Sequence, residues 1–313
     1  MVDERELALA VEADEAAPLS RRLLAEFLGT LLLVAVGTGT ATVLSAGPLL
    51  RLQSLTSGIP ASQQATFARQ FGALLANNLG DVFPVAFAFA TVLAVIVYAL
   101  GGISGAHVNP AVTFSLAVTR RFRWNDVPAY WVAQCLGGIA GAFVVAGIYG
   151  QHGASVGGTD ILFGATKIAP GINDYQAILA EAFVTFILVT AIMAIAIDPR
   201  APKGWSGLII GLALGAGILV TSAATGGSAN FARSLGPFVA SLIYNTNSIP
   251  WSDLYVYAVG PLIGGAAAAL IYESVSGLEV VSPAPRPGAA SPLDRAGNEL
   301  LDVEHDVADE VGD

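Results

Sequence analysis

The sequence predicts an all-α membrane protein with six membrane-spanning helices and two re-entrant half-helices, arranged as an inverted repeat. Three observations support this fold class. Six stretches of the chain are long and apolar enough to cross a bilayer, two further apolar stretches have about half that length, and the two halves of the chain resemble each other.

The apolar composition and its distribution provide the first observation. The 313 residues are 54% hydrophobic and 12% charged, whereas soluble domains contain about 25% charged residues. A helix that crosses the hydrocarbon core needs about 20 consecutive, mostly apolar residues. Six stretches meet this requirement, and we expect spans at about 22–45, 82–101, 128–149, 177–197, 206–224 and 252–274.

Two shorter apolar stretches remain, near 110–119 and 231–243. At a rise of about 1.5 Å per residue, each covers about half of a hydrocarbon core that is ~30 Å thick. Apolar segments of this length are typical of re-entrant pieces. We therefore expect two half-helices that enter the membrane and end inside it.

An internal repeat relates the two halves of the chain. LLAEFLGTLLLV at 23–34 aligns with ILAEAFVTFILV at 178–189, with equivalent residues 155 positions apart. GAHVNPA at 105–111 aligns with GGSANFA at 226–232 at an offset of 121, and Trp124 and Gly137 align with Trp251 and Gly264 at an offset of 127. Because the offset falls by 34 before the second pair of segments, the first half carries an insertion, which we place in a polar loop within 45–81.

An odd number of spans in each half makes the second half enter the membrane from the opposite side. Inverted repeats of this kind place their site near the midplane, where broken helices meet. Asn109 and Asn230 begin the two half-helices, so we expect them to meet there. We expect repeat one at about 21–150 and repeat two at about 176–275, within a membrane domain of residues 21–275.

The acidic residues are concentrated at the two ends of the chain. Residues 1–20 and 279–313 hold 15 of the 24 acidic residues, so the net charge of −10 is a property of the ends. We expect acidic, disordered tails at 1–20 and 276–313. The distribution of Lys and Arg predicts a multi-pass protein of the cell membrane with both termini in the cytoplasm. No basic patch exists to neutralise phosphates, which argues against nucleic acid as a partner.

Asn109-Pro110 is a favourable helix start, because Asn is a preferred N-cap residue and Pro a preferred first residue. A helix N-terminus exposes unpaired N–H groups and about half a positive charge. Two such N-termini facing each other make the midplane positive, and the Asn amides can donate hydrogen bonds to a passing oxygen. Such a site repels cations, protons included, while neutral water passes.

SGAHVNPAVT and SANFARSLGP, in this duplicated six-span frame, resemble the two motifs of the aquaporin and glycerol-facilitator family over roughly residues 20–275. A Glu in the first helix of each half and GPLIGGAAAALIYE in the last span add to the resemblance. It implies a homotetramer with one pore per subunit, no cofactor and no catalytic residue. It also implies a central constriction formed by Asn109, Pro110, Ala111, Asn230, Phe231 and Ala232.

Glu26 and Glu181 are the acids that lie deep in predicted spans, where charge is costly and usually functional. They could form a proton relay, or each could clamp the chain near it. Their pseudo-symmetric positions favour the clamp, and the resemblance implies that each carboxylate accepts backbone N–H groups of a re-entrant loop.

The resemblance maps the selectivity filter of the family to Phe89, Ile218, Gly227 and Arg233. Water-restricted members have a His where this chain has Ile218. Glycerol facilitators pair a Trp with a second aromatic residue and follow the Arg with Asp, whereas Ser234 follows Arg233 here, as in water channels. We expect a water channel of the water-channel-like branch, with glycerol or other small uncharged solutes and gases as the alternative cargo.

Phe231 departs from the family, which places Pro after the second Asn. The prolines of the two motifs are expected to touch, and overpacking at such a contact costs about 1–3 kcal/mol. We therefore expect either smaller neighbours around Phe231 or a shifted second half-helix. A shift would move Asn230 and Arg233 relative to the pore.

No metal site or enzyme active site is expected. The three His and the single Cys are scattered, without metal-ligand spacing. An enzyme or a proton-coupled transporter would need titratable pairs that face one cavity, and the repeat places Glu26 and Glu181 on opposite sides of the bundle. By resemblance, His107 lines the half of the pore nearer the cytoplasm; the alternative is a packed loop His.

Overall fold

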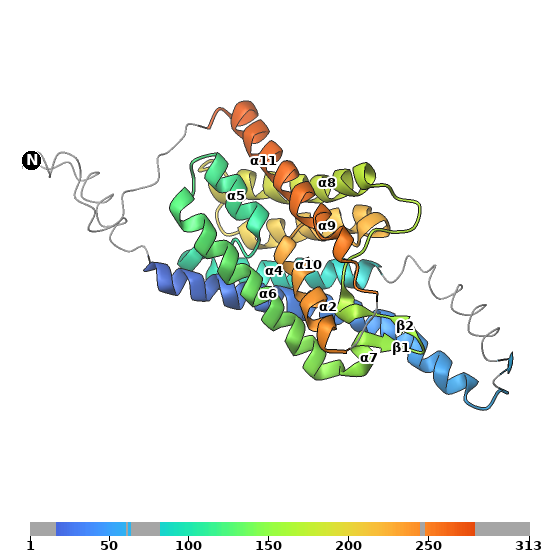
Figure 1. Ribbon diagram of the computed structural model, residues 1–313. Helices are drawn as coiled ribbons and strands as arrows, with labels where there is room; N and C mark the ends of the chain where they lie inside the picture. The colour runs from blue at the N-terminus through green and yellow to red at the C-terminus, as the bar shows by residue number, and fades with distance from the viewer. Residues whose placement is uncertain (1–16, 61, 64–81, 245–247, 279–313) are drawn as a thin grey trace, which may run out of the picture. The chain divides into compact units, whose positions relative to one another are not determined.

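The computed structural model describes residues 17–60, 62–63, 82–244 and 248–278 (Figure 1). Within these residues, six helices are long and apolar enough to cross a membrane. Their number and places confirm the predicted fold class. They are α2 (Leu19–Thr56), α4 (Val82–Ser104), α6 (Val127–Tyr149), α8 (Asp174–Ile192), α9 (Ser206–Thr225) and α11 (Val256–Ser276).

Two short helices lie where the half-length apolar stretches were predicted. They are α5 (Pro110–Val118) and α10 (Phe231–Ser241), and each begins directly after an Asn in extended backbone conformation. Most of their residues are buried. The predicted tails fall largely outside the described residues, and α2 begins at Leu19.

The described residues also contain short irregular elements, so the fold is not purely α-helical. A two-stranded antiparallel hairpin pairs Ser155 with Asp160 and Val156 with Thr159. A π-helical turn extends α8. The short elements are η2 (Trp124–Asp126), α7 (Gln151–Ala154), β1 (Ser155–Val156), β2 (Thr159–Asp160), η3 (Leu162–Gly164), η4 (Met193–Ile197), η5 (Leu242–Tyr244) and η6 (Trp251–Asp253).

The prediction of a polar loop over 45–81 is wrong for its first part, because α2 continues to Thr56. Pro48 lies inside this helix, although proline removes a helical hydrogen bond. The extension is packed: Ala46 forms a buried apolar cluster with Val156 and Ile161 next to the hairpin. Burial of that apolar surface stabilises a helix that the local Gly-Pro sequence disfavours. Most of the remaining predicted loop lies outside the described residues.

The helices pack in the pattern that the repeat requires. In the first half α2 packs against α4 and α6, and in the second half α8 packs against α9 and α11. The two halves join where α4 packs against α9. Each half-helix packs against the last helix of the other half, α5 against α11 and α10 against α6 (Figure 1). The half-helices therefore depend on both repeats for their position.

Equivalent glycines allow the closest of these contacts. A Cβ atom on Gly137 of α6 would collide with the backbone of Phe27, and a Cβ atom on Gly264 of α11 would collide with the backbone of Ala182. Phe27 and Ala182 are 155 positions apart and the two glycines 127, so both contacts follow the repeat. A Cβ atom on Gly138 would likewise collide with the backbone of Ala232, so the missing side chain lets α6 approach the start of α10.

Candidate functional site

A cavity of about 790 Å³ lies between the helices of the two halves. Phe89 and Arg233 line one part of it, and the loop from Gly105 to Asn109 lines another. A third part lies at helix ends on one side of the bundle. We call this part the charged mouth, and it is lined by Arg22, Arg121, Asp198 and Lys203.

Asn109 and Asn230 hold the two half-helices together through crosswise hydrogen bonds. The Nδ2 atom of Asn109 donates to the Ala229 carbonyl at 2.8 Å, and the Nδ2 atom of Asn230 donates to the Val108 carbonyl at 2.8 Å. Both side chains are buried, and both line the cavity. Since an amide nitrogen carries two hydrogens, each Asn keeps a second donor beyond the one that it gives to the opposite loop.

The same two side chains cap their own helices. The Oδ1 atom of Asn109 accepts the N–H of Ala111 at 2.9 Å, and that of Asn230 accepts the N–H of Ala232 at 3.0 Å. Pro110 is the first residue of α5, a position where its missing N–H removes no helical hydrogen bond. The predicted members of the central constriction therefore lie together, around two facing helix N-termini.

Glu26 of α2 contacts the loop before α5. Its Oε1 atom accepts the hydroxyl of Ser104 at 2.7 Å and the N–H of His107 at 3.0 Å. Its Oε2 atom accepts the N–H of Val108 at 2.7 Å and the side-chain amide of Gln134 at 2.8 Å. These four donors surround a fully buried carboxylate, which holds a loop whose residue Val108 has a φ of 43°, a conformation that is strained for a β-branched residue.

Glu181 of α8 has the equivalent position at the loop before α10. Its Oε1 atom accepts the hydroxyl of Thr225 at 2.6 Å and the N–H of Ser228 at 3.0 Å, and its Oε2 atom accepts the N–H of Ala229 at 2.8 Å. Ala229 has a φ of 55°. Each glutamate thus accepts two backbone N–H groups of an irregular loop. Because the loop is not helical, these N–H groups have no carbonyl partner within a helix.

Arg233 and Phe89 lie together among the residues that line the cavity. The guanidinium carbon of Arg233 lies 5.2 Å from the centroid of the Phe89 ring, and Nη1 donates to the Gly164 carbonyl at 3.0 Å. Gly37 leaves room for the ring, since a Cβ atom there would collide with it. The carbonyl and the ring fix one side of the guanidinium and leave further N–H donors for a solute.

Ile218 and Gly227 form a second pair of predicted filter residues. A Cβ atom on Gly227 would lie 3.1 Å from the Cα atom of Ile218 and 2.9 Å from the hydroxyl of Thr221. Gly227 also has a φ of 61°, a conformation that favours glycine. Both residues are buried, and neither is among the residues that line the cavity. The structure therefore places the four predicted filter residues in two pairs.

Phe231 leaves the register of the second half-helix unchanged. α10 begins at Phe231 directly after Asn230, just as α5 begins at Pro110 directly after Asn109. The crosswise hydrogen bond from Asn230 is as short as the one from Asn109. The Phe231 ring is half-buried, whereas Pro110 is buried, so the larger side chain keeps part of its surface outside the packed centre.

Sequence reasoning missed three residues at this site, namely Gln134, Thr113 and Gly164. Gln134 is fully buried in α6 and bonds to both Glu26 and Thr113. A polar side chain inside an apolar span is a recognisable signal, and it could have identified Gln134. Gly164 carries no such signal, because only its backbone carbonyl reaches Arg233.

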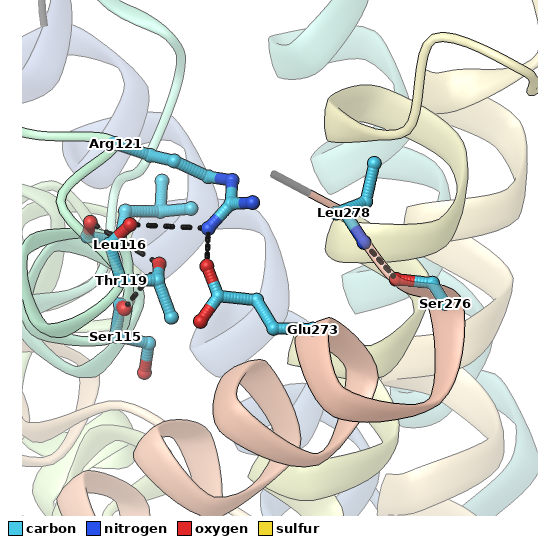
Figure 2. A network of polar contacts seen from close by, with 7 residues as sticks. All are labelled: Ser115, Leu116, Thr119, Arg121, Glu273, Ser276 and Leu278. Carbon is cyan, nitrogen blue, oxygen red and sulfur yellow. Dashed lines mark hydrogen bonds and ion pairs between the residues drawn. The ribbon is translucent and has the colours of Figure 1, made fainter. Parts of the chain in front are cut away.

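An ion pair fixes the end of α5 at the charged mouth (Figure 2). Arg121 follows α5, and its Nη1 atom donates to the Thr119 carbonyl at 3.1 Å and pairs with Glu273 of α11. The N–H of Arg121 also donates to the Leu116 carbonyl at 2.8 Å. The carbonyl end of the half-helix is thus covered by a cation, which the helix dipole favours.

Asp198 forms a second fixed charge at the mouth, just after the end of the fourth span. Arg200 donates to its two oxygens at 2.8 Å and 2.6 Å, and the hydroxyl of Tyr272 donates at 2.9 Å. The hydrogen bonds from Arg200 hold the pKa of the Asp198 carboxyl well below its usual range. Asp198 is therefore ionised at neutral pH, and the mouth carries charges of both signs.

The described residues contain no group of three or more His, Cys, Asp or Glu side chains that could hold a metal ion. His107 lies in the cavity wall, with its Nδ1 atom 3.1 Å from the hydroxyl of Thr113. Cys135 lies partly buried on α6.

Known proteins resemble this chain over most of its length. A family model described as major intrinsic protein matches residues 14–272. Aquaporin AqpM of Methanothermobacter marburgensis is 40% identical over 256 residues, which cover 82% of this chain and 97% of that protein. Probable aquaporin AqpM of Archaeoglobus fulgidus is 40% identical over 254 residues, which cover 81% and 96%.

Among solved structures, the fold resembles that of the aquaglyceroporin from Plasmodium falciparum. The TM-score is 0.63 at 24% identity, and the match covers 83% of this chain and 97% of the other. The shared fold supports the helical membrane fold described above, and the family model and the relatives agree on the family. The chain belongs to the major intrinsic protein family, whose members are membrane channels and not enzymes.

Proposed function

We propose that this channel conducts water passively and excludes protons and ions. The observation that carries the proposal is the meeting of two half-helix N-termini at Asn109 and Asn230. Each Asn donates one Nδ2 hydrogen to the opposite loop and has a second one that can bind a solute. A water oxygen that accepts both free hydrogens must direct its own hydrogens along the pore, away from the centre.

The positive ends of α5 and α10 provide the barrier to cations. Each helix N-terminus carries about half a positive charge, and in an apolar surrounding such charges act strongly on an ion. A central water that donates only outward cannot accept a proton from its neighbours while both Asn amides bind it. Water passes, whereas a proton or a metal cation meets a barrier.

Arg233 adds a second positive group on the same path. Its buried guanidinium contacts Phe89 and the Gly164 carbonyl, and its remaining N–H groups can bind solute oxygens. Phe89 and Arg233 give this part of the cavity one apolar and one polar wall. We propose Phe89, Ile218, Gly227 and Arg233 as the selectivity filter.

A second candidate function is the passage of glycerol or other small uncharged solutes and gases. It is favoured by Ile218 and Gly227, which place no polar side chain at this part of the filter. A filter with one Arg and otherwise apolar members offers few hydrogen bonds to water, and discriminates less against an apolar solute.

Stopped-flow light scattering on proteoliposomes tests both functions side by side. An osmotic step with sucrose is expected to shrink the vesicles several times faster than empty vesicles, and glycerol-driven reswelling measures the second function. Shrinkage at the rate of empty vesicles would reject the water channel. A membrane that conducts water and remains closed to glycerol would reject glycerol as a cargo of this channel.

Arg233→Val is expected to open the channel to cations while water still passes. The change removes the one buried guanidinium of the proposed filter and leaves Asn109 and Asn230 in place. A pH-sensitive dye inside the vesicles measures proton entry, and the osmotic assay measures water on the same preparation. An Arg233→Lys variant keeps the charge without the fork-shaped donors and is the matched control. Unchanged proton entry in Arg233→Val would contradict a filter role for this residue.

We further propose a homotetramer in the cell membrane with both termini in the cytoplasm. Exposed apolar side chains such as Ile148, Leu179 and Val220 provide surface for lipid and for neighbouring subunits. Native mass spectrometry from detergent measures the subunit number, and a dominant monomer would contradict the tetramer. Protease cleavage of a terminal tag in sealed vesicles of known orientation measures the topology.

A further inference from the structure

The His107 ring is held in one orientation in the wall of the cavity. Its Nδ1 atom lies 3.1 Å from the Thr113 hydroxyl, and its ring packs against Phe122 and Tyr130 with centroid distances of 4.9 and 5.3 Å. The Nε2 atom lies beside Gly105, which also lines the cavity, and a Cβ atom there would lie 3.0 Å from it. Nδ1 therefore faces Thr113, and Nε2 lies beside a residue that lines the cavity.

Gln134 has an orientation that Glu26 dictates. The Nε2 atom of Gln134 lies 2.8 Å from Oε2 of Glu26 and 2.9 Å from the hydroxyl oxygen of Thr113. The Glu26 carboxylate, which accepts the N–H groups of His107 and Val108, has acceptors and no donor. The group of Gln134 that faces it must therefore be a donor. The amide nitrogen must face Glu26, and the same nitrogen then donates its second hydrogen to Thr113.

The Thr113 hydroxyl has a single hydrogen, which it gives to the backbone. Its oxygen lies 3.2 Å from the Asn109 carbonyl, one turn earlier in α5, which is the usual acceptor for a helical threonine. With that hydrogen used and Gln134 donating, the oxygen can only accept from His107. The proton on the imidazole must then be on Nδ1, since the tautomer is set by the hydrogen bond that the other nitrogen makes.

We propose that Glu26, Gln134 and Thr113 are positioning residues that fix His107 as the Nδ1-protonated tautomer, so that Nε2 accepts a hydrogen bond from water in the pore. The inference rests on the proposed water channel and deepens it. Water on either side of the two Asn residues has its hydrogens directed away from the centre and needs acceptors in the wall. A donor at Nε2 would oppose this orientation, whereas a lone pair supports it.

The second half of the repeat solves the same problem without a histidine. Ser228 and Ser234 are the equivalents of His107 and Thr113, 121 positions later. Their hydroxyl oxygens lie 2.7 Å apart, and Ser234 lies 2.8 Å from the Thr166 hydroxyl. Pro261 is the equivalent of Gln134 and has no amide to donate. The series of hydrogen bonds from Glu26 through Gln134 and Thr113 to His107 is therefore specific to the first half, where the tautomer of an imidazole has to be set.

Nitrogen-15 NMR of histidine-labelled protein in lipid bilayers tests the proposal, because the chemical shifts separate protonated from unprotonated ring nitrogens. The chain has three His, and a His107→Ala sample identifies the signal. Wild-type His107 is expected to have a protonated Nδ1 and an unprotonated Nε2. In Thr113→Val, which keeps the shape and removes the hydroxyl, the proton is expected to move to Nε2. Thr113→Ser keeps the hydroxyl and is expected to resemble wild type.

Water permeability provides the second readout. Loss of one hydrogen-bond acceptor for pore water is expected to lower permeability about two- to tenfold in Thr113→Val, and not in Thr113→Ser. In a His107→Ala background, Thr113→Val is expected to cause no further decrease. A wild-type Nε2 proton, or a tautomer that Thr113→Val leaves unchanged, would overturn the proposal. Wild-type protein with the predicted tautomer but no water flux would reject the water channel instead.

Discussion

Replacing Glu181 with leucine is expected to abolish water permeability and to lower the free energy of unfolding by about 2–6 kcal/mol, because two buried N–H groups lose their acceptor at about 1–3 kcal/mol each. These N–H groups belong to Ser228 and Ala229, directly before Asn230. The loop is held in a left-handed conformation at Ala229, which persists only while the surroundings impose it. Without the carboxylate, the loop relaxes and Asn230 leaves the centre of the pore.

Thermal unfolding followed by tryptophan fluorescence in detergent measures the loss of stability, and the osmotic assay measures the loss of function. Glu181→Gln keeps one acceptor oxygen and is expected to give an intermediate result. Asp174→Asn is the matched control, since it removes an acid from the exposed start of the same helix. A Glu181→Leu protein with wild-type unfolding temperature and permeability would show that the carboxylate does not hold the loop.

Gly138→Val is expected to have the second large effect, because it forces α6 away from the start of α10. A Cβ atom at Gly138 would collide with the backbone carbonyl of Ala232, and the backbone there cannot rotate away as a side chain can. Overpacking of this kind costs about 1–3 kcal/mol, occasionally more. Arg233 follows Ala232 directly, so the displacement also moves the guanidinium from Phe89 and from the Gly164 carbonyl.

Gly147→Val is the control within the same helix. Nothing lies within 4 Å of a Cβ atom at Gly147, so this change alters helix propensity by the same amount without a collision. We expect Gly138→Val to lose both water permeability and several degrees of unfolding temperature, and Gly147→Val to keep both. Equal behaviour of the two variants would contradict the close approach of α6 and α10.

The internal repeat makes most of the fold predictable from the sequence. Offsets of 155 and 127 positions relate Phe27 to Ala182 and Gly137 to Gly264 in the sequence alone, and these residues form equivalent helix contacts. The half-helices are predictable because an Asn signals a helix start in both, followed by Pro in the first, and because the apolar stretches are too short to cross. In both cases a local pattern is repeated, which makes chance agreement rare.

The features that sequence reasoning missed depend on contacts between distant segments. The last part of α2, from Ser45 to Thr56, is stabilised by packing of Ala46 against Val156 and Ile161, which lie more than 100 positions later. The carbonyl of Gly164 reaches Arg233 from an irregular turn, and a backbone atom leaves no residue-type signature. Local propensity cannot report either contact, since both arise from tertiary structure.

Phe231 shows the limit of reasoning from volume alone. The volume of the ring predicts smaller neighbours or a shifted helix. The structure keeps the register of α10, and the ring remains half-buried. A side chain at the edge of a packed centre can direct surplus volume outward, and the sequence does not indicate which direction is open.

The crosswise hydrogen bonds of the two Asn residues also have a consequence for how the protein is made. Asn109 donates to a carbonyl 120 positions later in the chain, so its partner does not exist when the first three spans leave the ribosome. Closing so large a loop is slow compared with forming a helix. We expect the first half to insert into the membrane before the loop that precedes α5 has the hydrogen bond between Asn109 and Ala229. Both crosswise hydrogen bonds become possible only after Ala229 and Asn230 have also entered the membrane, so we expect the two loops to be completed together.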